Sequence, residues 1–287
     1  MCREPRAVHA NSIHGAIAHS LFAIDSRAMV TRRERLRAEL IRDIKSTALA
    51  HLREHGADGL SLRAVARDLG VSAPGLYRYY SGRDDLLTVL IADSFHDLAD
   101  HMLVALGADA SQLSGIDRHP PRPPQTVDAG ATPGDRMKVI ARAYRAWCLE
   151  HPHEFGLIYG DPIPGYAAPE GGVTVEANRR VATTLLRPIV DGWVAGSIRI
   201  PDAFSGDLGA GARQLAEEIE SVIGEEVPIG LAGLTLSLWA WLHGLVSLEV
   251  FGQFHWIYPD SAEPLFEAAL TAQLTSVGLL PANAMAK

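Results

Sequence analysis

The stretch that decides the fold is SLRAVARDLGVSAPGLYRYY, residues 61–80. Ser61 is suited to cap a short helix, and the apolar residues that follow share one helical face: Leu62, Val65, Ala66 and Leu69. Gly70 suits the left-handed backbone needed after such a helix. Ser72 is suited to cap a second short helix over residues 73–80, with Pro74 in the first turn. Two short helices joined by a glycine turn predict a helix-turn-helix.

Helices are also predicted on both sides of this motif. Upstream, residues 33–55 carry an apolar stripe formed by Leu36, Leu40, Ile41, Ile44, Ala48, Leu49 and Leu52. Thr31 and Glu34 have the spacing of a capping box, and Gly56 is suited to end this helix. Downstream, the break at Ser81 precedes a long predicted helix over residues 83–106. We therefore expect a three-helix unit over residues 31–83, continued by a long helix.

The net charge of −8 conceals a segregation of charge along the chain. Residues 27–83 contain twelve Arg or Lys and six acidic residues, whereas residues 84–287 contain twelve basic and 26 acidic residues. The first part can attract a phosphate backbone, and the second part repels it. This distribution predicts a nucleic-acid interface confined to the helix-turn-helix.

The rest of the chain also predicts helices, so the expected fold class is all-α. Aromatic residues make up only 7% of the chain, which disfavours a sandwich or a barrel. Helical periodicity extends over residues 135–150, 154–159, 175–193, 213–223, 229–254 and 262–279. We expect residues 84–287 to form one helical domain.

Residues 229–254 indicate how the chain associates with itself. Their leucines and one tryptophan recur at alternating spacings of three and four: Leu231, Leu234, Leu238, Trp241, Leu245 and Leu248. Such a seam packs lengthwise against other helices. Together with residues 262–279, it predicts a four-helix bundle with a two-fold partner. The alternative is that the stripe serves only the core of its own chain.

Two segments have compositions of a different kind. Residues 107–134 contain five prolines and several small polar residues, which favours a flexible insertion over a proline-rich partner-binding segment. Residues 1–30 are expected to form a flexible arm, or an extension upstream of a start at Met29. A signal peptide over 13–24 is disfavoured because histidines interrupt it. No apolar run reaches the ~18 residues of a membrane span, so no membrane partner is expected.

The string of residues from Ser61 to Leu87 closely resembles the tetracycline-repressor (TetR) family. The order of Val65-Ala66, Leu69-Gly70-Val71-Ser72, Gly75 to Tyr80 and Arg83-Asp84 carries the resemblance. It implies an all-helical homodimer with an N-terminal domain for a near-palindromic double-stranded operator and a C-terminal domain for a small effector. The implied function is a cytoplasmic bacterial transcriptional regulator, expected to be a repressor, associated with the nucleoid when bound.

The resemblance also implies which residues contact DNA. Ser61 and Arg63 would contact phosphate and the groove edge, and Arg83 would replace the family's usual phosphate-binding lysine. Through the start of the second short helix, Ser72, Ala73, Pro74 and Gly75 would approach bases. Tyr77 would bind a phosphate, and Arg78 and Tyr79 would reach bases or the adjacent backbone. The chain departs from the family pattern in two ways. Tyr79 occupies the first of two positions that usually hold an aromatic residue or a histidine, and the N-terminal arm is longer than in many members.

The C-terminal half gives less specific indications. Trp241-Leu242-His243-Gly244, with His151-Pro152 upstream, resembles a TetR subgroup with a Trp/His-Gly pattern. The candidate lining of a pocket for a small, mostly apolar ligand is Trp147, Phe155, Tyr159, Trp193, Trp239 and His243, with Tyr166 as a further candidate. Ordinary core packing is the competing explanation for these aromatic residues. For His243, the competing explanation is a core or interface histidine whose hydrogen bonds are satisfied within the protein.

An enzyme carrying an appended helix-turn-helix is the main alternative function. The residues that could form a thiol or metal site are Cys148, His151, His153, Glu154 and Asp161. However, no nucleophile elbow, phosphate loop or HExxH pattern accompanies them. Cys148 is expected to be a small buried hydrophobe. We expect no catalytic residues, no metal and no cofactor. A second alternative is a non-specific DNA-compacting protein, which the acidic C-terminal half disfavours.

Overall fold

The structure is a computed structural model that describes residues 31–56, 59–109, 130–224 and 226–282. Over these ranges the chain forms ten α-helices and one short 3₁₀ helix, with no β-strand. The predicted all-α fold class is confirmed. The predicted arm over residues 1–30 and most of the predicted insertion, residues 110–129, lie outside the described residues.

The first three helices form the headpiece, which we define as residues 31–83. Helix α1 spans Arg32–His55, α2 spans Leu62–Asp68 and α3 spans Ala73–Leu76. The predicted capping box is present, because the Thr31 hydroxyl accepts from the Glu34 N–H at 3.2 Å and the Glu34 carboxylate accepts from the Thr31 N–H at 2.7 Å. Gly70 has the expected left-handed backbone, with φ of 65°.

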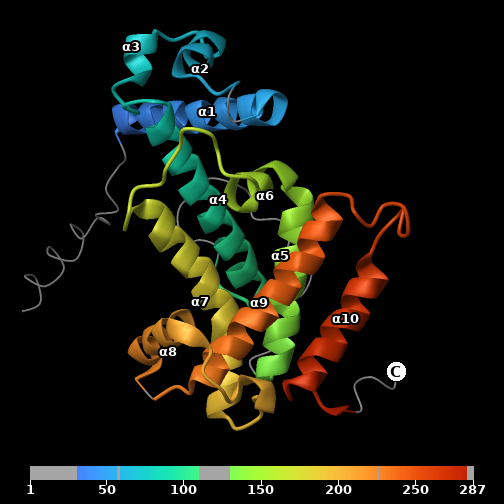
Figure 1. Ribbon diagram of the computed structural model, residues 1–287. Coiled ribbons are helices and arrows are strands. Elements are labelled where there is room, and N and C mark those ends of the chain that lie inside the picture. Colours follow the sequence, from blue (N-terminus) through green and yellow to red (C-terminus); the bar gives the residue numbers. More distant parts are fainter. Residues whose placement is uncertain (1–30, 57–58, 110–129, 225, 283–287) are drawn as a thin grey trace, which may run out of the picture.

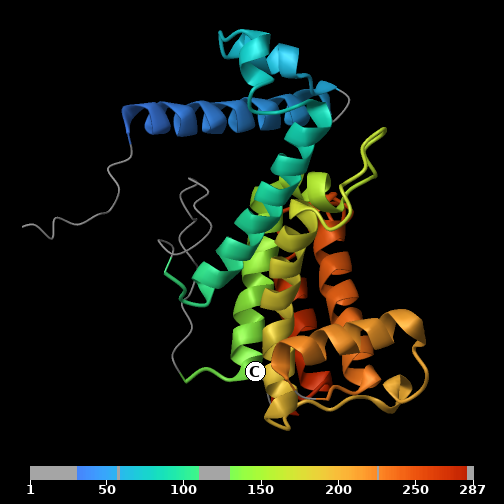
Figure 2. The same ribbon diagram turned by 90° about the vertical axis from the view of Figure 1, so that its left-hand side faces the viewer.

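Three details of the headpiece differ from the sequence-based predictions. Helix α3 ends at Leu76, and residues 77–79 form a turn, since the chain must reverse before α4. Ser61 and Ser72 occupy N-cap positions, but their side chains make no capping hydrogen bond. Leu36, expected on the buried stripe, is 55% exposed because the N-terminal turns of α1 extend beyond the other headpiece helices (Figure 2).

The headpiece has its own apolar core. Ile44 and Ala48 of α1, Val65 of α2 and Leu76 of α3 are fully buried, and Leu87 at the start of α4 closes the cluster. In Figure 1, α1 lies across the top of α4, with α2 and α3 above it. Because α4 contributes to this core and then continues into the rest of the molecule, it connects the two parts rigidly.

The body, defined here as residues 84–282, is a bundle of long helices. Helix α4 spans Arg83–Ala105 and packs against α5 and α7. The remaining helices are α5 (Pro133–Glu150), α6 (Pro152–Tyr159), α7 (Val173–Val194), α8 (Gly209–Ile223), α9 (Ile229–Val250) and α10 (Glu263–Ser276). The short 3₁₀ helix Asp202–Phe204 packs on α9. Figures 1 and 2 show α4, α5 and α7 side by side.

Several predicted boundaries in the body are corrected. Helix α5 begins at Pro133, inside the predicted insertion 107–134, because Thr132 and Asp135 form a capping box that the sequence reading missed. Helix α6 begins at Pro152, since proline suits a first helical turn. Helix α8 begins four residues earlier than predicted, at Gly209, and α9 ends at Val250 rather than at residue 254.

Charged and aromatic side chains hold α5 at the centre of the body. Tyr144, Trp147 and Cys148 are fully buried, and Cys148 is a free thiol, as expected of a small buried hydrophobe. Two bidentate ion pairs then join α5 to its neighbours. Arg145 binds Glu249 of α9 at 2.7 and 2.6 Å, and Arg142 binds Glu267 of α10 at 2.7 and 2.6 Å.

Helix α9 is the most apolar helix of the described chain. By length and composition it could cross a membrane, but Leu231, Leu234 and Leu238 are buried in the core of this chain. This burial is typical of the core helix of a globular protein. The N-terminal half of the predicted seam therefore serves the intrachain core, whereas Leu248 at its other end is 45% exposed.

Candidate nucleic-acid interface and internal cavity

The residues predicted to approach bases lie together on one face of the headpiece. Four of these residues are exposed, namely Ser72, Pro74, Tyr77 and Arg78, and the other three, Ala73, Gly75 and Tyr79, are half-buried. Leu76 and Tyr80, expected to face inward, are buried in the headpiece core. These two anchors fix the orientation of α3, so the same face always points outward.

Gly75 leaves one position on this face of α3 without a side chain. A Cβ atom at this position would lie 3.2 Å from the Ser72 Oγ and 3.9 Å from the Arg78 Nη2. A methyl group here would make ordinary contact with Arg78 but would crowd the Ser72 hydroxyl, which would have to shift slightly. A glycine here allows the backbone of α3 to approach a groove more closely than any other residue would.

The exposed N-terminal part of α1 adds basic residues next to this face. Arg32, Arg33, Arg35 and Arg37 are all exposed. The Arg37 guanidinium lies 5.8 Å from the centre of the Tyr79 ring, a cation–π distance. The charge pattern of the sequence includes these arginines but does not place Arg37 beside α3. Only the three-dimensional crossing of α1 over the turn at residues 77–79 reveals the contact.

The start of α2 and the start of α4 flank α3. Ser61 and Arg63 are exposed. The His51 Nε2 of α1 lies 2.7 Å from the Asp68 carboxylate of α2, and this hydrogen bond lowers the pKa of Asp68. Arg83 is half-buried at the N-terminus of α4, where its Nη1 lies 3.3 Å from the Asp84 carboxylate. Arg83 is thus held in place beside a helix N-terminus, which favours anions.

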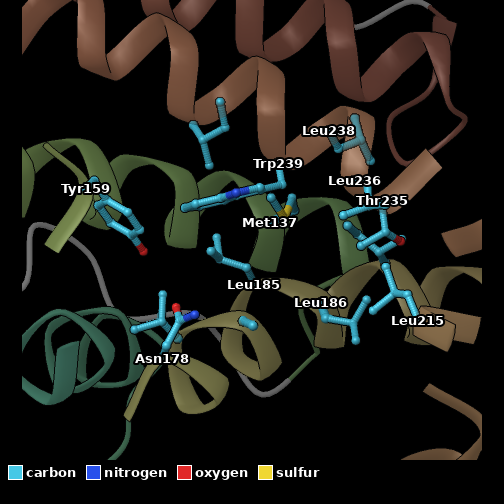
Figure 3. Close-up of a pocket in the computed structure, with 14 residues that line it drawn as sticks. Met137, Tyr159, Asn178, Leu185, Leu186, Leu215, Thr235, Leu236, Leu238 and Trp239 are labelled. Carbon is cyan, nitrogen blue, oxygen red and sulfur yellow. The ribbon is translucent and has the colours of Figure 1, made fainter. Parts of the chain in front are cut away.

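The body contains a cavity of about 280 Å³ between α5, α6, α7, α8 and α9 (Figure 3). Its lining consists mainly of aliphatic side chains. The lining residues are Met137, Tyr159, Asn178, Val181, Ala182, Leu185, Leu186, Ile189, Leu215, Thr235, Leu236, Leu238, Trp239 and Leu242. The cavity can hold a small apolar molecule.

Only two of the six predicted pocket residues, Tyr159 and Trp239, line this cavity. Trp147 is fully buried elsewhere in the core, where its Nε1 donates to the Asp97 carboxylate at 2.9 Å. Phe155 is also fully buried, with its ring centre 5.6 Å from that of His243. These two side chains lie outside the lining of this cavity, because other core side chains cover their surfaces.

Two further candidates, Trp193 and Tyr166, also lie outside the lining of the cavity. Trp193 is half-buried near the C-terminal end of α7, outside the lining. Tyr166, in the loop after α6, lies with its hydroxyl 2.9 Å from the Thr88 hydroxyl of α4. Sequence reasoning also missed the aliphatic lining, such as Leu185, since residues facing a cavity and residues facing a filled core have the same helical spacing.

His243 lies directly behind the aromatic residues of the lining. Its Nδ1 lies 2.9 Å from the Tyr144 hydroxyl and its Nε2 lies 3.3 Å from the Ser247 hydroxyl. Its ring stacks on Trp239 at 5.0 Å between ring centres. Burial lowers the pKa of His243, so the ring is neutral at physiological pH. This is the satisfied core histidine that the sequence analysis gave as the competing explanation.

Helix α1 joins the headpiece to the body through ion pairs. The Arg53 Nη2 of α1 lies 2.5 Å from the Glu154 Oε1 of α6, and the Glu154 side chain is 1% exposed. The Lys45 Nζ of α1 lies 2.6 Å from the Asp93 carboxylate of α4. Helix α6 therefore contacts the headpiece through Glu154 and the cavity through Tyr159, five residues later.

The residues considered for a thiol or metal site do not form one. Cys148 is buried, and burial raises the pKa of its thiol, which disfavours the reactive thiolate. Across the described ranges of the chain, no group of three or more His, Cys, Asp or Glu side chains is placed to hold a metal ion.

A helix-turn-helix headpiece on an all-helical body with a largely aliphatic cavity is the architecture of a one-component transcriptional regulator. Two family models match this chain. Residues 44–90 match the bacterial regulatory proteins of the tetR family, and residues 137–273 match the tetracycline repressor-like C-terminal domain. The chain belongs to the TetR family. Its assignment to a Trp/His-Gly subgroup stays a prediction.

Individual relatives agree with this assignment. The chain is 34% identical over 230 residues to the HTH-type transcriptional regulator Rv1816 of Mycobacterium tuberculosis, covering 78% of this chain and 86% of the relative. The crystal structure of a regulatory protein designated SCO4313 is 31% identical and superposes with a TM-score of 0.61, covering 85% of this chain and all of that one.

A more distant structure shows the same fold. It is a regulatory protein of the tetR family from Rhodococcus RHA1, 13% identical, with a TM-score of 0.52 over 83% of this chain and 96% of that one. The chain is thus a TetR-family helix-turn-helix transcriptional regulator. Regulators of this family bind DNA operators, dimerise and bind small molecules, and they are generally not enzymes.

Proposed function

We propose that this protein is a homodimeric repressor that leaves a near-palindromic operator when a small, mostly apolar molecule fills the cavity of the body. The observation that carries the proposal is the largely aliphatic cavity of about 280 Å³, which shares helix α6 with the contact to the headpiece. The alternative, an enzyme with an appended helix-turn-helix, has no support from the side chains around this cavity.

The DNA-binding role rests on the exposed face of α3. Arg78 and Tyr79 are the proposed base-contacting or backbone-contacting side chains, and Ser61, Tyr77 and Arg83 are the proposed phosphate-contacting ones. Two copies of α3 would occupy successive major grooves about 34–36 Å apart. The operator would then consist of two half-sites related by the two-fold axis of the protein.

The dimer is proposed to form through α9 and α10. Along α9, a stripe of small and apolar residues remains accessible: Ser237, Ala240, Gly244 and Leu248. Small residues let two helices approach closely, and Leu248 contributes apolar surface to bury. A second copy of this chain is the partner that matches a continuous stripe on a helix otherwise committed to its own core.

Two helices can transmit the occupancy of the cavity to the headpiece. Helix α4 belongs to the cores of both parts, and α6 contacts both the cavity and Arg53 of α1. A ligand that prefers the conformation with altered spacing of the two α3 helices would release DNA. The size of the release is limited by the difference in ligand affinity between the two conformations.

Selection of bound duplexes from a random DNA pool tests the DNA-binding part of the proposal. We expect a palindromic consensus with half-site centres about one helical turn apart. Uniform affinity for random duplexes would instead identify a DNA-compacting protein. The selected duplex then serves in a release assay with small apolar compounds, and an increase in operator affinity on ligand binding would contradict the repressor model.

We place this activity in the cytoplasm, with the bound protein in the nucleoid.

A further inference from the structure

Besides the indole N–H of Trp239, the lining of the cavity includes three polar side chains: Tyr159, Asn178 and Thr235. The Thr235 hydroxyl donates to the Leu231 carbonyl of its own helix at 2.8 Å, so its hydrogen-bonding capacity is largely used. Asn178 is exposed and can be satisfied by solvent. The Tyr159 hydroxyl differs from both, because its oxygen is fully buried and makes no hydrogen bond.

The Tyr159 ring is fixed by aromatic neighbours on several sides. Its ring centre lies 5.6 Å from that of Phe95, 5.8 Å from Trp239 and 4.8 Å from His243. His243 would be the obvious partner for the hydroxyl, but both of its ring nitrogens already face hydroxyls, those of Tyr144 and Ser247. In Figure 3 the Tyr159 hydroxyl points from the end of α6 toward the space enclosed by the lining.

Buried hydroxyls in proteins nearly always have a hydrogen-bond partner. We infer that the cavity takes an uncharged molecule, apolar over most of its length, whose single carbonyl or hydroxyl oxygen accepts a hydrogen bond from Tyr159. This inference rests on the proposed function and adds the chemical class of the ligand and the residue that selects it.

Three observations support an uncharged ligand with an acceptor group. Burial raises the pKa of Tyr159, so the hydroxyl keeps its proton and donates it. No Lys or Arg side chain is among the described residues of the lining, and His243 behind it is neutral. A carboxylate or phosphate at the buried end of the cavity, beside Tyr159, would therefore lack a counter-charge, which is strongly unfavourable.

The volume of the cavity limits the size of the molecule. At ~30 Å³ for each water-sized unit, 280 Å³ corresponds to a molecule of roughly ten non-hydrogen atoms. Three probes of this size carry different polar groups: 2-nonanone is neutral with one acceptor, octanoate is anionic, and butylcyclohexane has no polar group.

The test measures binding of these three probes to the full-length protein by calorimetry and thermal shift, without DNA. We expect 2-nonanone to bind more tightly than octanoate. In Tyr159→Phe, we expect the affinity for 2-nonanone to fall about tenfold and that for butylcyclohexane to be unchanged. Tyr166→Phe is the matched control, since it removes a tyrosine hydroxyl outside the cavity and should leave all three affinities unchanged.

A measurement without ligand checks the same hydroxyl independently. Tyr159→Phe removes a buried polar group that lacks a hydrogen bond, so the melting temperature should stay the same or rise, whereas Tyr166→Phe should lower it. A marked fall for Tyr159→Phe would show that the hydroxyl already has a partner, which would overturn the inference.

The inference is also overturned if octanoate binds more tightly than 2-nonanone, if Tyr159→Phe binds 2-nonanone as well as the native protein, or if none of the probes binds. Failure of the proposed function has a different signature. Tyr159-dependent binding of 2-nonanone that never reduces the affinity for the selected operator would leave the ligand class intact and reject ligand-induced release.

Discussion

The headpiece and the body are both bundles of helices, yet their interiors differ in how completely they are filled and paired. In the described part of the headpiece, the core is a closed apolar cluster. Its buried histidine, His51, is hydrogen-bonded to Asp68 through Nε2, and only its Nδ1 is buried without a partner. The body contains a cavity and several buried polar atoms without hydrogen bonds, among them both ring nitrogens of His101 and the Tyr159 hydroxyl.

This difference matches the two tasks of a ligand-controlled regulator. A headpiece that reads DNA must hold α3 in one orientation, which a densely packed core achieves. A body that responds to a ligand needs an alternative packing of similar free energy, and unfilled space and unpaired polar groups lower the cost of repacking. The predictions below test this comparison, beginning with the largest expected effect.

The core of the headpiece should be the most sensitive region. Leu76→Ala removes the fully buried side chain that anchors α3, and we expect it to lower the free energy of unfolding by about 2–5 kcal/mol and to abolish operator binding. The control is Leu36→Ala on the exposed part of α1, expected to change stability by less than about 0.5 kcal/mol. Denaturant titration measures both. Equal effects of the two substitutions would show that the headpiece core is not closed.

The contact between the two parts should matter for their communication. Arg53→Ala leaves the buried Glu154 carboxylate without its partner on α1, and we expect a loss of about 1–3 kcal/mol of stability, the lower part of the range for a buried pair because Arg53 is 46% exposed. Ligand-induced release of operator should also weaken. Arg179→Ala, which breaks an exposed pair with Glu176, is the control and should cost less than about 0.5 kcal/mol.

The exposed face of α3 should separate base reading from phosphate binding. Arg78→Ala should cost about 1–3 kcal/mol of operator affinity and relax sequence preference, whereas Arg83→Ala should weaken binding to all sequences and flatten its salt dependence. Affinity measurements at several salt concentrations, on operator and scrambled duplexes, distinguish the two. Unchanged operator binding in both variants would refute the proposed contact face.

Replacing the buried histidine of the body, His101, should have the smallest effect. It should raise the free energy of unfolding, whereas the core and ion-pair substitutions above lower it. Burial lowers the pKa of His101, so below about pH 6.5 the unfolded chain takes up a proton that the native state resists, and stability falls with decreasing pH. Nearby Asp97 and Glu150 raise this pKa and His151 lowers it further.

We therefore expect His101→Leu to raise the free energy of unfolding by about 1 kcal/mol at pH 7 and by more at pH 5.5, because it removes an unpaired buried polar group. Melting curves across this range measure the change. A variant that melts lower than the native protein at both pH values would show that His101 is paired in solution.

The sequence predicted the headpiece well because local rules govern it. The capping box at Thr31 and Glu34, the left-handed Gly70 and the inward-facing Leu76 and Tyr80 each follow from contacts within a few residues. The end of α3 was predicted four residues too late. Its position depends on how the chain must turn to join α4, which no local pattern specifies.

The cavity was predicted poorly, for a physical reason. The sequence identified Tyr159 and Trp239 but also selected Trp147 and Phe155, which fill the core. Aromatic side chains at helical spacing show only that a face is buried, and burial is the same whether the neighbour is a side chain or empty space. The aliphatic lining, Leu185 included, gave no distinct signal.

By itself, the sequence determined the helix-turn-helix, the all-α class and the separation of charge, because residue spacing and charge along the chain specify them directly. Tertiary structure alone decided that Arg37 lies over Tyr79, that Arg53 binds Glu154, and that Tyr159 projects an unpaired hydroxyl into a cavity. Each of these features arises where helices distant in sequence meet, and their geometry depends on the packing of the whole chain.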